Sequence, residues 1–282
     1  MPRKIIAKEI ISYSLLAVIL ILSFVPILMM VSMSLRDSLM IYGDFWGMPW
    51  PPKINNYSFA LLDLMAPILR TLYLCIISIL GIMLFATLSG YAFARLRFVG
   101  RNLMFWIIVM LMTVPGVLLL TPNFVLADWL HLKNSLDGLA VFYIGGGQLF
   151  AIFLLRTFFT SQPEEMFEAA RVEGANEFRC VWSIALPLAR PILITIAIMN
   201  FLSIYNDLIW PMLMISTPDL QTISMALANY APDAGNSIGK ISRPDLGIIT
   251  SGYVFASIPL LLMFMLGMRY FIEGLTSGSI KA

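Results

Sequence analysis

Six long stretches without Asp, Glu, Lys or Arg constrain the fold of this chain more than any other feature of its sequence. A helix that crosses the hydrocarbon core of a bilayer needs about 20 predominantly apolar residues. In lipid the backbone must satisfy its own hydrogen bonds, and a helix does so within one segment. The sequence therefore predicts an all-α integral membrane protein with six transmembrane helices. The stretches are Ile10–Leu35, Thr71–Ala94, Asn102–Ala127, Gly138–Leu155, Pro191–Asn206 with its continuation past Asp207 as Leu208–Ser216, and Leu246–Met268.

Composition indicates the same class of protein. Hydrophobic residues make up 60% and charged residues 12% of the 282 residues, and the mean hydropathy is +0.87. Soluble globular domains hold roughly 45 to 50% apolar and about 25% charged residues, so a water-soluble fold is excluded. The net charge is only +2 and the basic residues are scattered, which argues against nucleic acid as a partner.

The first apolar stretch follows a basic start, so a cleaved signal peptide is the alternative to a first transmembrane helix. Its apolar core is longer than the roughly 7 to 15 residues of a signal peptide. No small-x-small cleavage site follows before Arg36. We therefore expect an uncleaved helix.

The distribution of Lys and Arg predicts the orientation. Twelve of the 18 basic residues fall on the side that holds the N-terminus, the segment after Ala94, the loop after Leu155 and the C-terminus. Because cytoplasmic segments carry the excess of basic residues, both termini are expected in the cytoplasm. Three long outward segments are then expected at 37–66, 122–137 and 218–245.

Cysteine and histidine offer little for chemistry. Cys75 lies in an apolar stretch and Cys180 in a charged loop, so we expect no disulfide. The single histidine, His131, lies in a short amphipathic stretch and is expected to be a solvated interfacial residue and not a ligand. We expect no catalytic, cofactor-binding or metal-binding residue in this chain.

The loop Thr157–Ala189 begins with the punctuation of a short helix. Ser161 and Glu164 have the spacing of a capping box, and Pro163 suits a first turn. The helix is expected to end at Gly174. Four residues can share its apolar face: Met166, Ala169, Ala170 and Val172.

A second short helix is expected after that glycine. Asn176 is a candidate cap, and Pro187 with Pro191 ends the pattern before the next span. The residues that recur at helical spacing are Phe178, Val181, Trp182 and Ala185. The loop is thus predicted to form a helix, a glycine turn and a helix.

Two interpretations of this hairpin remain open, a helix pair resting on the membrane and a surface that docks a protein. Membrane-resting helices are usually rich in lysine, whereas an anionic leaflet would repel an acidic hairpin. Docking to a basic protein surface is therefore favoured. The acids of the loop are Glu164, Glu165, Glu168, Glu173 and Glu177.

One pattern in the hairpin is specific. Glu168-Ala169-Ala170, Gly174 after three more residues, and Ile184-Ala185-Leu186-Pro187 after nine more resemble the EAA loop of binding-protein-dependent permeases. Glu173 stands where aspartate is frequent in that loop, and Trp182 stands where phenylalanine is frequent. Neither change alters charge or aromatic character.

Two further segments resemble the carbohydrate-type permeases of this family. Residues 205–211, Tyr-Asn-Asp-Leu-Ile-Trp-Pro, are similar to a fifth-helix segment, with Tyr205 in place of a common tryptophan. Gly274-Leu275-Thr276-Ser277-Gly278 is similar to the tail of the maltose-type second subunit. The resemblance covers the chain from about Ala66 to its C-terminus.

The resemblance implies a type I ABC importer transmembrane domain in a bacterial cytoplasmic membrane. It implies a second, homologous permease subunit, a dimeric ATP-binding subunit that holds ATP and Mg, and an extracytoplasmic solute-binding protein. The implied function is ATP-driven import of a sugar or oligosaccharide by alternating access. The implied ATPase-coupling residues are Glu168, Ala169, Ala170, Glu173, Gly174, Ala175, Phe178, Leu186 and Pro187, with the tail Gly274, Leu275, Thr276, Ser277 and Gly278 as a further contact.

The expected organisation has three parts. Residues 1–66 form the first helix and an extracytoplasmic segment, residues 67–271 form the transmembrane core with a coupling loop at 158–189, and residues 272–282 form a cytoplasmic tail. A polyol or glycerol-phosphate cargo within the same family is the alternative. An ion-coupled transporter or a membrane enzyme is a more distant one, because a single span holds an acid and clustered catalytic groups are absent from the sequence.

The fifth span carries a polar cluster that suits the hydroxyl groups of a sugar. An acid at membrane depth is costly and usually faces protein or water. Counting from Pro191 places Asp207 near the outer interface, so a structural role, bonding the backbone near Pro211, is as well supported as ligand contact. The candidate pathway residues are Asn200, Ser203, Tyr205, Asn206 and Asp207.

Two glycine-containing segments carry other interpretations. Residues 235–242 superficially suggest a phosphate-binding loop, but the spacing is wrong and Ile241 stands where Ser or Thr must meet magnesium. The run Gly145–Gly147 is expected to permit close helix packing and not substrate binding.

Overall fold

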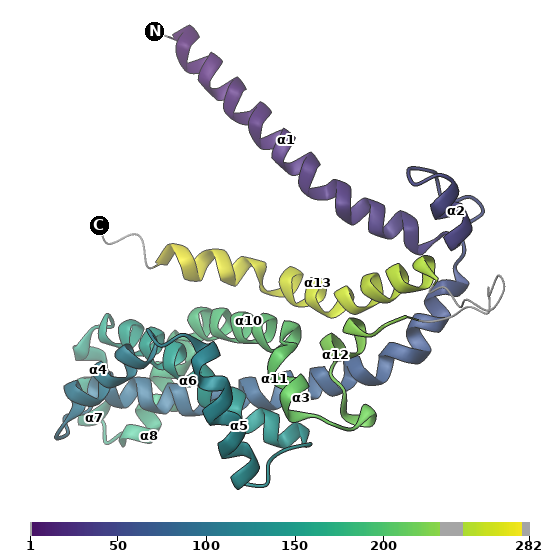
Figure 1. Ribbon diagram of the computed structural model, residues 1–282. Coiled ribbons are helices and arrows are strands. Elements are labelled where there is room, and N and C mark those ends of the chain that lie inside the picture. The colour runs from purple at the N-terminus through teal and green to yellow at the C-terminus, as the bar shows by residue number, and fades with distance from the viewer. Residues whose placement is uncertain (1, 232–244, 278–282) are drawn as a thin grey trace. The chain divides into compact units, whose positions relative to one another are not determined.

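The computed structural model of the chain describes the backbone of residues 2–231 and 245–277 and the side chains of residues 12–231 and 245–268. These residues form helices joined by short connections (Figure 1). Four helical segments are long and apolar enough to cross a membrane: Ser12–Ser34, Asn55–Arg95, Leu136–Thr160 and Leu246–Met268. Two bent helix pairs raise the number of candidate spans to as many as six. The prediction of an all-helical membrane fold is confirmed.

The helices before the hairpin loop include α3 and α1, the two longest of the described chain (Figure 1). They are α1 (Pro2–Ser34), α2 (Ser38–Gly43), α3 (Asn55–Arg95), α4 (Arg101–Leu111), η1 (Gly116–Leu119), α5 (Leu120–Trp129) and α6 (Leu136–Thr160). The later elements are α7 (Glu164–Val172), α8 (Glu177–Cys180), η2 (Val181–Ala185), α9 (Leu186–Leu188), α10 (Arg190–Asn206), α11 (Ile209–Met214), η3 (Pro218–Leu220), α12 (Ile223–Ala228) and α13 (Leu246–Ser277).

The described chain divides into two compact units, and two of the boundaries between them fall at prolines inside long helices. The first unit holds the residues up to Ala66 and those described within Leu227–Ile258, and the second begins at Pro67 and resumes at Pro259. Pro67 lies inside α3 and Pro259 inside α13. Proline removes a backbone donor, and membrane helices tolerate it where neighbouring groups replace the lost bond.

A buried arginine organises the first unit. The Arg36 side chain donates to the carbonyl oxygens of Met40 at 2.7 Å, Phe45 at 3.2 Å and Asp44, so it ties together the loop around α2. The side-chain amide of Asn56, at the start of α3, donates to the backbone carbonyl oxygen of Arg36 at 3.1 Å. Three hydrogen bonds to carbonyl oxygens thus compensate for the burial of this charge.

The core of the second unit lies against the hairpin loop. It joins α3, α6, α7, α8, η2 and α10 through buried side chains. Phe159, Phe167, Tyr91 and Cys180 are at most 1% exposed. The Tyr91 ring contacts the rings of Phe159 and Phe167, with centroids 6.1 Å and 6.0 Å away. The hairpin is therefore packed into the bundle and does not hang free.

Several predicted boundaries are wrong. The third span is broken, because α4 ends at Leu111 and the chain turns by 100° at Pro115 before α5. The second span begins at Asn55 and not near Thr71, since the segment expected as an outward loop is helical from there. In the fifth span, α10 ends at Asn206 as predicted, and the expected continuation past Asp207 forms a separate helix, α11, from Ile209.

Candidate functional site

The hairpin loop between α6 and α10 is the first candidate site, and its turn is set by local backbone chemistry. After α7, Gly174 has a φ of +87°, the left-handed conformation that favours glycine. The Ala175 amide donates to the Ala170 carbonyl at 2.9 Å and the Gly174 amide donates to the Arg171 carbonyl at 3.0 Å, which closes the helix end. The helix thus ends at the glycine, where the spacing predicts it to end.

The second half of the hairpin begins with a side-chain cap. The side-chain oxygen Oδ1 of Asn176 accepts the Arg179 backbone amide at 2.9 Å, so Asn176 acts as the predicted cap of α8. The chain then runs through the π-helical segment η2 and through α9 to Ala189. Between Leu188 and Arg190 the axis bends by 77° into α10. The break falls between Pro187 and Pro191, the residues expected to interrupt the pattern.

Buried and charged contacts anchor the hairpin to the end of α3. The Arg95 guanidinium donates to the carbonyl oxygens of Phe159 and Gln162, each at 2.6 Å, and pairs with Glu164. It also lies 4.3 Å above the centre of the Phe167 ring. One turn away, the Tyr91 hydroxyl donates to Glu177 at 2.6 Å.

Arg171 extends this network across the hairpin. It donates to Glu177 at 2.9 Å and pairs with Glu164 at 3.4 Å, so α7 is tied to α8. Partial desolvation would raise the pKa of Glu164, but hydrogen bonds from Arg95 and Arg171 outweigh it and hold the pKa below its ordinary value. The hydrogen bond to Glu177 raises the pKa of Arg171. Sequence spacing gave no sign of Tyr91 or Arg95, because their partners lie 64 to 86 residues away.

The expected capping box does not form. The Ser161 hydroxyl donates to the Phe158 carbonyl at 2.8 Å, and Pro163 precedes α7 as its N-cap. Glu164 is drawn to the two arginines instead. The distant ion pairs therefore override the local motif.

The apolar faces of the hairpin also differ from those predicted. On α7 the fully buried residue is Phe167, whereas Val172 is 88% exposed. In the second half, Val181 and Ala185 are buried, whereas Phe178 and Trp182 are 68% and 50% exposed. The hairpin packs one face against the bundle and leaves large apolar groups exposed on the other. Such an exposed apolar surface is typical of a site that contacts another molecule.

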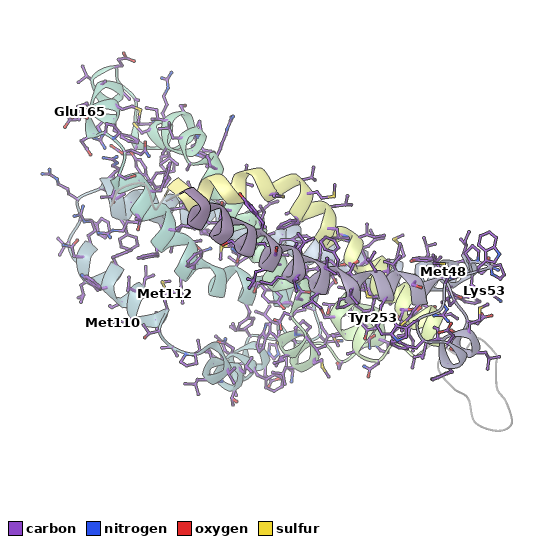
Figure 2. All side chains as sticks on the ribbon, turned by 90° about the horizontal axis from the view of Figure 1, so that it is seen from above. Met48, Lys53, Met110, Met112, Glu165 and Tyr253 are labelled. Carbon is purple, nitrogen blue, oxygen red and sulfur yellow. The ribbon has the colours of Figure 1, made fainter. Side chains whose placement is uncertain are left out.

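The predicted coupling residues lie mostly on that exposed face. Ala170, Ala175 and Leu186 pack partly against the core. Neighbouring Glu165, labelled in Figure 2, is exposed as well. The exposed members of the predicted set are Glu168, Ala169, Glu173, Gly174, Phe178 and Pro187.

The second candidate site is a pocket of about 320 Å³ between α6 and α10. Asn200 and Ser203, two of the predicted pathway residues, line it. The α6 wall carries aromatic side chains, which the sequence did not distinguish from the rest of an apolar span. The full lining is Phe142, Tyr143, Gly146, Gly147, Phe150, Met199, Asn200, Ser203 and Ile204.

The other three predicted pathway residues lie outside this pocket. Tyr205 is buried, with its ring stacked on Phe201 at a centroid distance of 5.5 Å. The side-chain amide of Asn206 donates to the backbone carbonyl of Leu202 at 2.8 Å. Asp207 accepts the Ile209 amide at 3.1 Å and the Tyr143 hydroxyl at 2.8 Å. Its carboxylate therefore caps α11 and ties it to α6, the structural alternative weighed above.

The glycine run of α6 has two roles. A Cβ at Gly147 would lie 2.4 Å from Ile82 Cδ1, so this glycine permits the close packing that we predicted. A Cβ at Gly145 or Gly146 would meet nothing within 4 Å. Gly146, which lines the pocket, leaves it open, so the packing prediction applies to Gly147 and not to the other two glycines.

Several remaining predictions fall in other parts of the chain. Gly274–Ser277 form the last turn of α13, and Gly278 lies outside the described residues. The loop at 235–242 also lies outside them. Cys75 and Cys180 are buried free thiols. Among the described residues, no group of three or more His, Cys, Asp or Glu side chains could hold a metal ion.

The fold defines a class: an integral membrane protein of helices in which a structured hairpin joins two spans. Residues 78–277 match the family described as binding-protein-dependent transport system inner membrane component. The chain belongs to this family of transport permeases. The predicted resemblance is thereby confirmed.

Relatives within the family carry names of sugar transporters. An arabinooligosaccharides transport system permease protein of Halalkalibacterium halodurans is 30% identical, covering 75% of this chain and 72% of its own. A diacetylchitobiose uptake system permease protein of Streptomyces coelicolor is 26% identical, covering 96% and 88%. A maltodextrin transport system permease protein of Bacillus subtilis is 31% identical, covering 69% and 68%.

A solved structure has the same fold. The crystal structure of a bacterial ABC transporter involved in the import of the acidic polysaccharide alginate contains a chain with a TM-score of 0.80 to this one. The two sequences are 21% identical, and the match covers 94% of this chain and 96% of the other. The predicted type I importer architecture is confirmed by this likeness.

Proposed function

We propose that this chain is a permease subunit of an ATP-driven sugar importer and that its hairpin loop transmits force from a separate ATPase. The observation that carries the proposal is the hairpin itself, which is fixed to α3 by Arg95 and Tyr91 yet exposes Phe178 and Val172. A rigid attachment is what a lever needs. Exposed apolar groups beside glutamates suit a partner surface that is apolar and basic.

The proposed complex holds a second permease subunit, a dimeric ATPase and an external binding protein. When the ATPase dimer closes on ATP, the hairpin moves with it and tilts α3, α6 and α10, to which it is packed. The pathway alternates between inward-open and outward-open states. The proposed orientation places both termini in the cytoplasm, and the tail segment Gly274–Gly278 is proposed to contact the ATPase.

A sugar or oligosaccharide is the proposed cargo. The relatives named for arabinooligosaccharides, diacetylchitobiose and maltodextrin support it and do not favour a polyol or glycerol phosphate. The pocket supports it too, because Phe142, Tyr143 and Phe150 offer faces for sugar C–H groups and Asn200 and Ser203 offer hydrogen bonds.

Gly174→Asp tests the docking of the ATPase. The substitution puts a charge and a side chain at the tip of the hairpin, so the ATPase should no longer co-purify while the permease remains folded and inserted. Gly100→Asp is the matched control, because Gly100 has a φ of +82° and open space around it in a different turn. Equal co-purification of the two variants would refute the docking role of the hairpin.

Two asparagines of α10 test the pocket. Asn200 donates to Ile196 at 2.9 Å and Asn206 donates to Leu202 at 2.8 Å, so each makes the same type of backbone bond. Only Asn200 lines the pocket. In vesicles holding the full complex, Asn200→Ala should lower uptake of labelled oligosaccharide about tenfold and Asn206→Ala should leave it nearly unchanged. Equal uptake by both variants would exclude this pocket from the pathway.

A further inference from the structure

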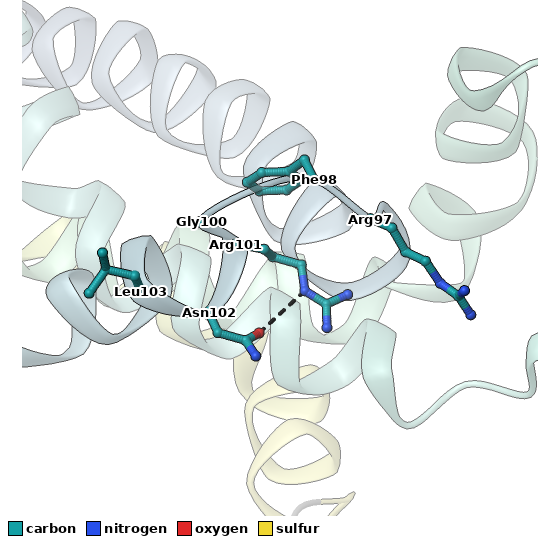
Figure 3. Close-up of a pocket in the computed structure, with 6 residues that line it drawn as sticks. All are labelled: Arg97, Phe98, Gly100, Arg101, Asn102 and Leu103. Atoms are coloured by element: carbon teal, nitrogen blue, oxygen red, sulfur yellow. Dashed lines mark hydrogen bonds between the residues drawn. The ribbon is translucent and has the colours of Figure 1, made fainter.

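The turn between α3 and α4 holds an open pocket of about 340 Å³ that has no part in the proposed transport mechanism. Figure 3 shows Arg97 and Arg101 in this turn, with Arg101 hydrogen-bonded to the neighbouring Asn102. Arg101 also donates to the Leu96 carbonyl at 3.2 Å, which fixes its guanidinium beside the pocket. The lining residues are Arg97, Phe98, Gly100, Arg101, Asn102 and Leu103.

The positive charge around this pocket is not neutralised by the described part of the protein. Arg156 of α6 lies over the Phe105 ring at 3.7 Å, one turn along α4 from Arg101, and the two arginines repel each other electrostatically. Among the described side chains, ion pairs are formed by Lys53, Arg95, Lys133 and Arg171 and by none of these three arginines. Arg101 and Arg156, two like charges without a paired carboxylate, favour an anion beside them.

The cations adjoin a surface that suits hydrocarbon. Val99, at the tip of the turn, is 100% exposed, and Leu103 at the edge of the pocket is 67% exposed. Ile107 and Met110 follow Leu103 at intervals of four and three residues, so they continue an exposed apolar stripe along α4. Met110 is labelled in Figure 2. The pocket therefore joins a cationic end to an apolar side.

The position of the turn fixes its depth. The helix α3, long and apolar enough to cross a membrane, ends at Arg95 and α4 starts at Arg101, so in the proposed orientation the turn lies at the cytoplasmic surface of the bilayer. That depth is occupied by lipid headgroups. Basic pockets at helix ends on the cytoplasmic side are able to bind anionic headgroups, each nearby Lys or Arg adding to the attraction.

We propose that this pocket binds one anionic phospholipid. Arg97 and Arg101 hold its phosphate by charge-assisted hydrogen bonds, and an acyl chain lies along Leu103 and Ile107. A free phosphate would leave the apolar stripe uncovered, and an acidic protein would leave Val99 and Leu103 without hydrocarbon. The lipid satisfies both ends of the site.

Native mass spectrometry of the full chain, purified in detergent, tests the site. Dioleoyl phosphatidylglycerol and dioleoyl phosphatidylcholine share their acyl chains and differ in net charge, so they separate the headgroup contribution from hydrocarbon contact. The wild type should retain one phosphatidylglycerol in preference to phosphatidylcholine. The Arg97→Gln/Arg101→Gln variant should bind it roughly tenfold more weakly.

The matched control is Arg179→Gln/Arg190→Gln, which removes two exposed arginines outside the pocket. It should keep the preference for phosphatidylglycerol. Equal retention of the two lipids by the wild type, or equal weakening in both double variants, would overturn the proposal. Displacement of the lipid by millimolar inorganic phosphate would assign the site to the free anion. Binding of the purified ATPase that depends on these two arginines and excludes the lipid would assign the site to that protein.

Discussion

At the scale of single residues, Arg95 is the side chain on which the hairpin depends most. Its side chain is only 4% exposed. It pairs with two backbone carbonyls, one carboxylate and one aromatic face. Such a planar, forked set of contacts suits arginine and not lysine. These contacts join α3 to Phe159 at the end of α6 and to Glu164 at the start of α7.

Arg95→Gln should lower the free energy of unfolding by about 3 kcal/mol, because buried carbonyls and Glu164 lose their partner. Arg95→Lys should recover little of the loss. Thermal unfolding of the purified protein in detergent measures both. Arg179→Gln, an exposed arginine of α8, is the control and should change stability by less than about 0.5 kcal/mol. A loss of that small size for Arg95→Gln as well would disprove the anchoring role.

The attachment of α7 should weaken in acid. The pKa of Glu164 lies below its ordinary value of 4.5 in the folded protein. Its contribution to stability is therefore complete above about pH 4.5 and is lost as the pH falls through the lowered folded value. Hydrogen exchange of the α7 amides, corrected for intrinsic rates, should show lower protection at pH 3.5 than at pH 7. Glu164→Gln should reduce this pH dependence, and an unchanged dependence in that variant would contradict the assignment to Glu164.

At the scale of elements, the glycine run of α6 packs closely at Gly147 and is open at Gly145 and Gly146. Gly147 lies against Ile82, which is 1% exposed and has little room to move. Gly145 faces open space. The same helix therefore offers two Gly→Ala substitutions with opposite expected effects on the free energy of unfolding.

Gly147→Ala should destabilise the protein by about 1 kcal/mol through overpacking. Gly145→Ala should stabilise it by about 0.5 kcal/mol, because alanine costs less conformational entropy than glycine in a helix. Unfolding midpoints of the two variants give the comparison. Should both shift in the same direction, the close contact at Gly147 would not be the determinant.

The apolar stretches predicted most of the elements because lipid imposes length and hydropathy on a spanning helix. They could not predict the early start of α3, where exposed polar residues such as Asn55 and Ser58 precede the apolar run. They also concealed the turn at Pro115, since apolar residues lie on both sides of it. Hydropathy measures burial in lipid and is insensitive to a bend.

The motif of the predicted coupling residues and the cap residue Asn176 could both be read from the sequence, because both patterns are local in it. The pocket was visible only on its α10 side, where Asn200 and Ser203 are polar. Phe142 and Tyr143 look like any residues of an apolar span, and only packing of α6 against α10 brings them to the same cavity. Arg95 was counted for topology alone, because no spacing rule connects it to residues 159–164.

At the scale of the whole molecule, the proposed orientation is open to direct labelling. Glu165→Cys introduces an exposed thiol on α7, and the native Cys75 and Cys180 are buried, so they need no replacement. A membrane-impermeant maleimide should label this variant from the cytoplasmic side only. Leu39→Cys in α2 is the counterpart and should be labelled from outside, because it is 68% exposed. The reverse pattern would invert the topology.

The helix α1 has no buried residue in its apolar stretch 12–33, and burial begins only at Ser34. The interior of this polypeptide therefore exerts no selection on the identity of those side chains, and only the surrounding medium distinguishes one from another. Exchange of this stretch for an unrelated apolar helix of equal length should leave the remaining helices intact. Any harm from such a chimera would reveal a neighbour supplied by a different molecule.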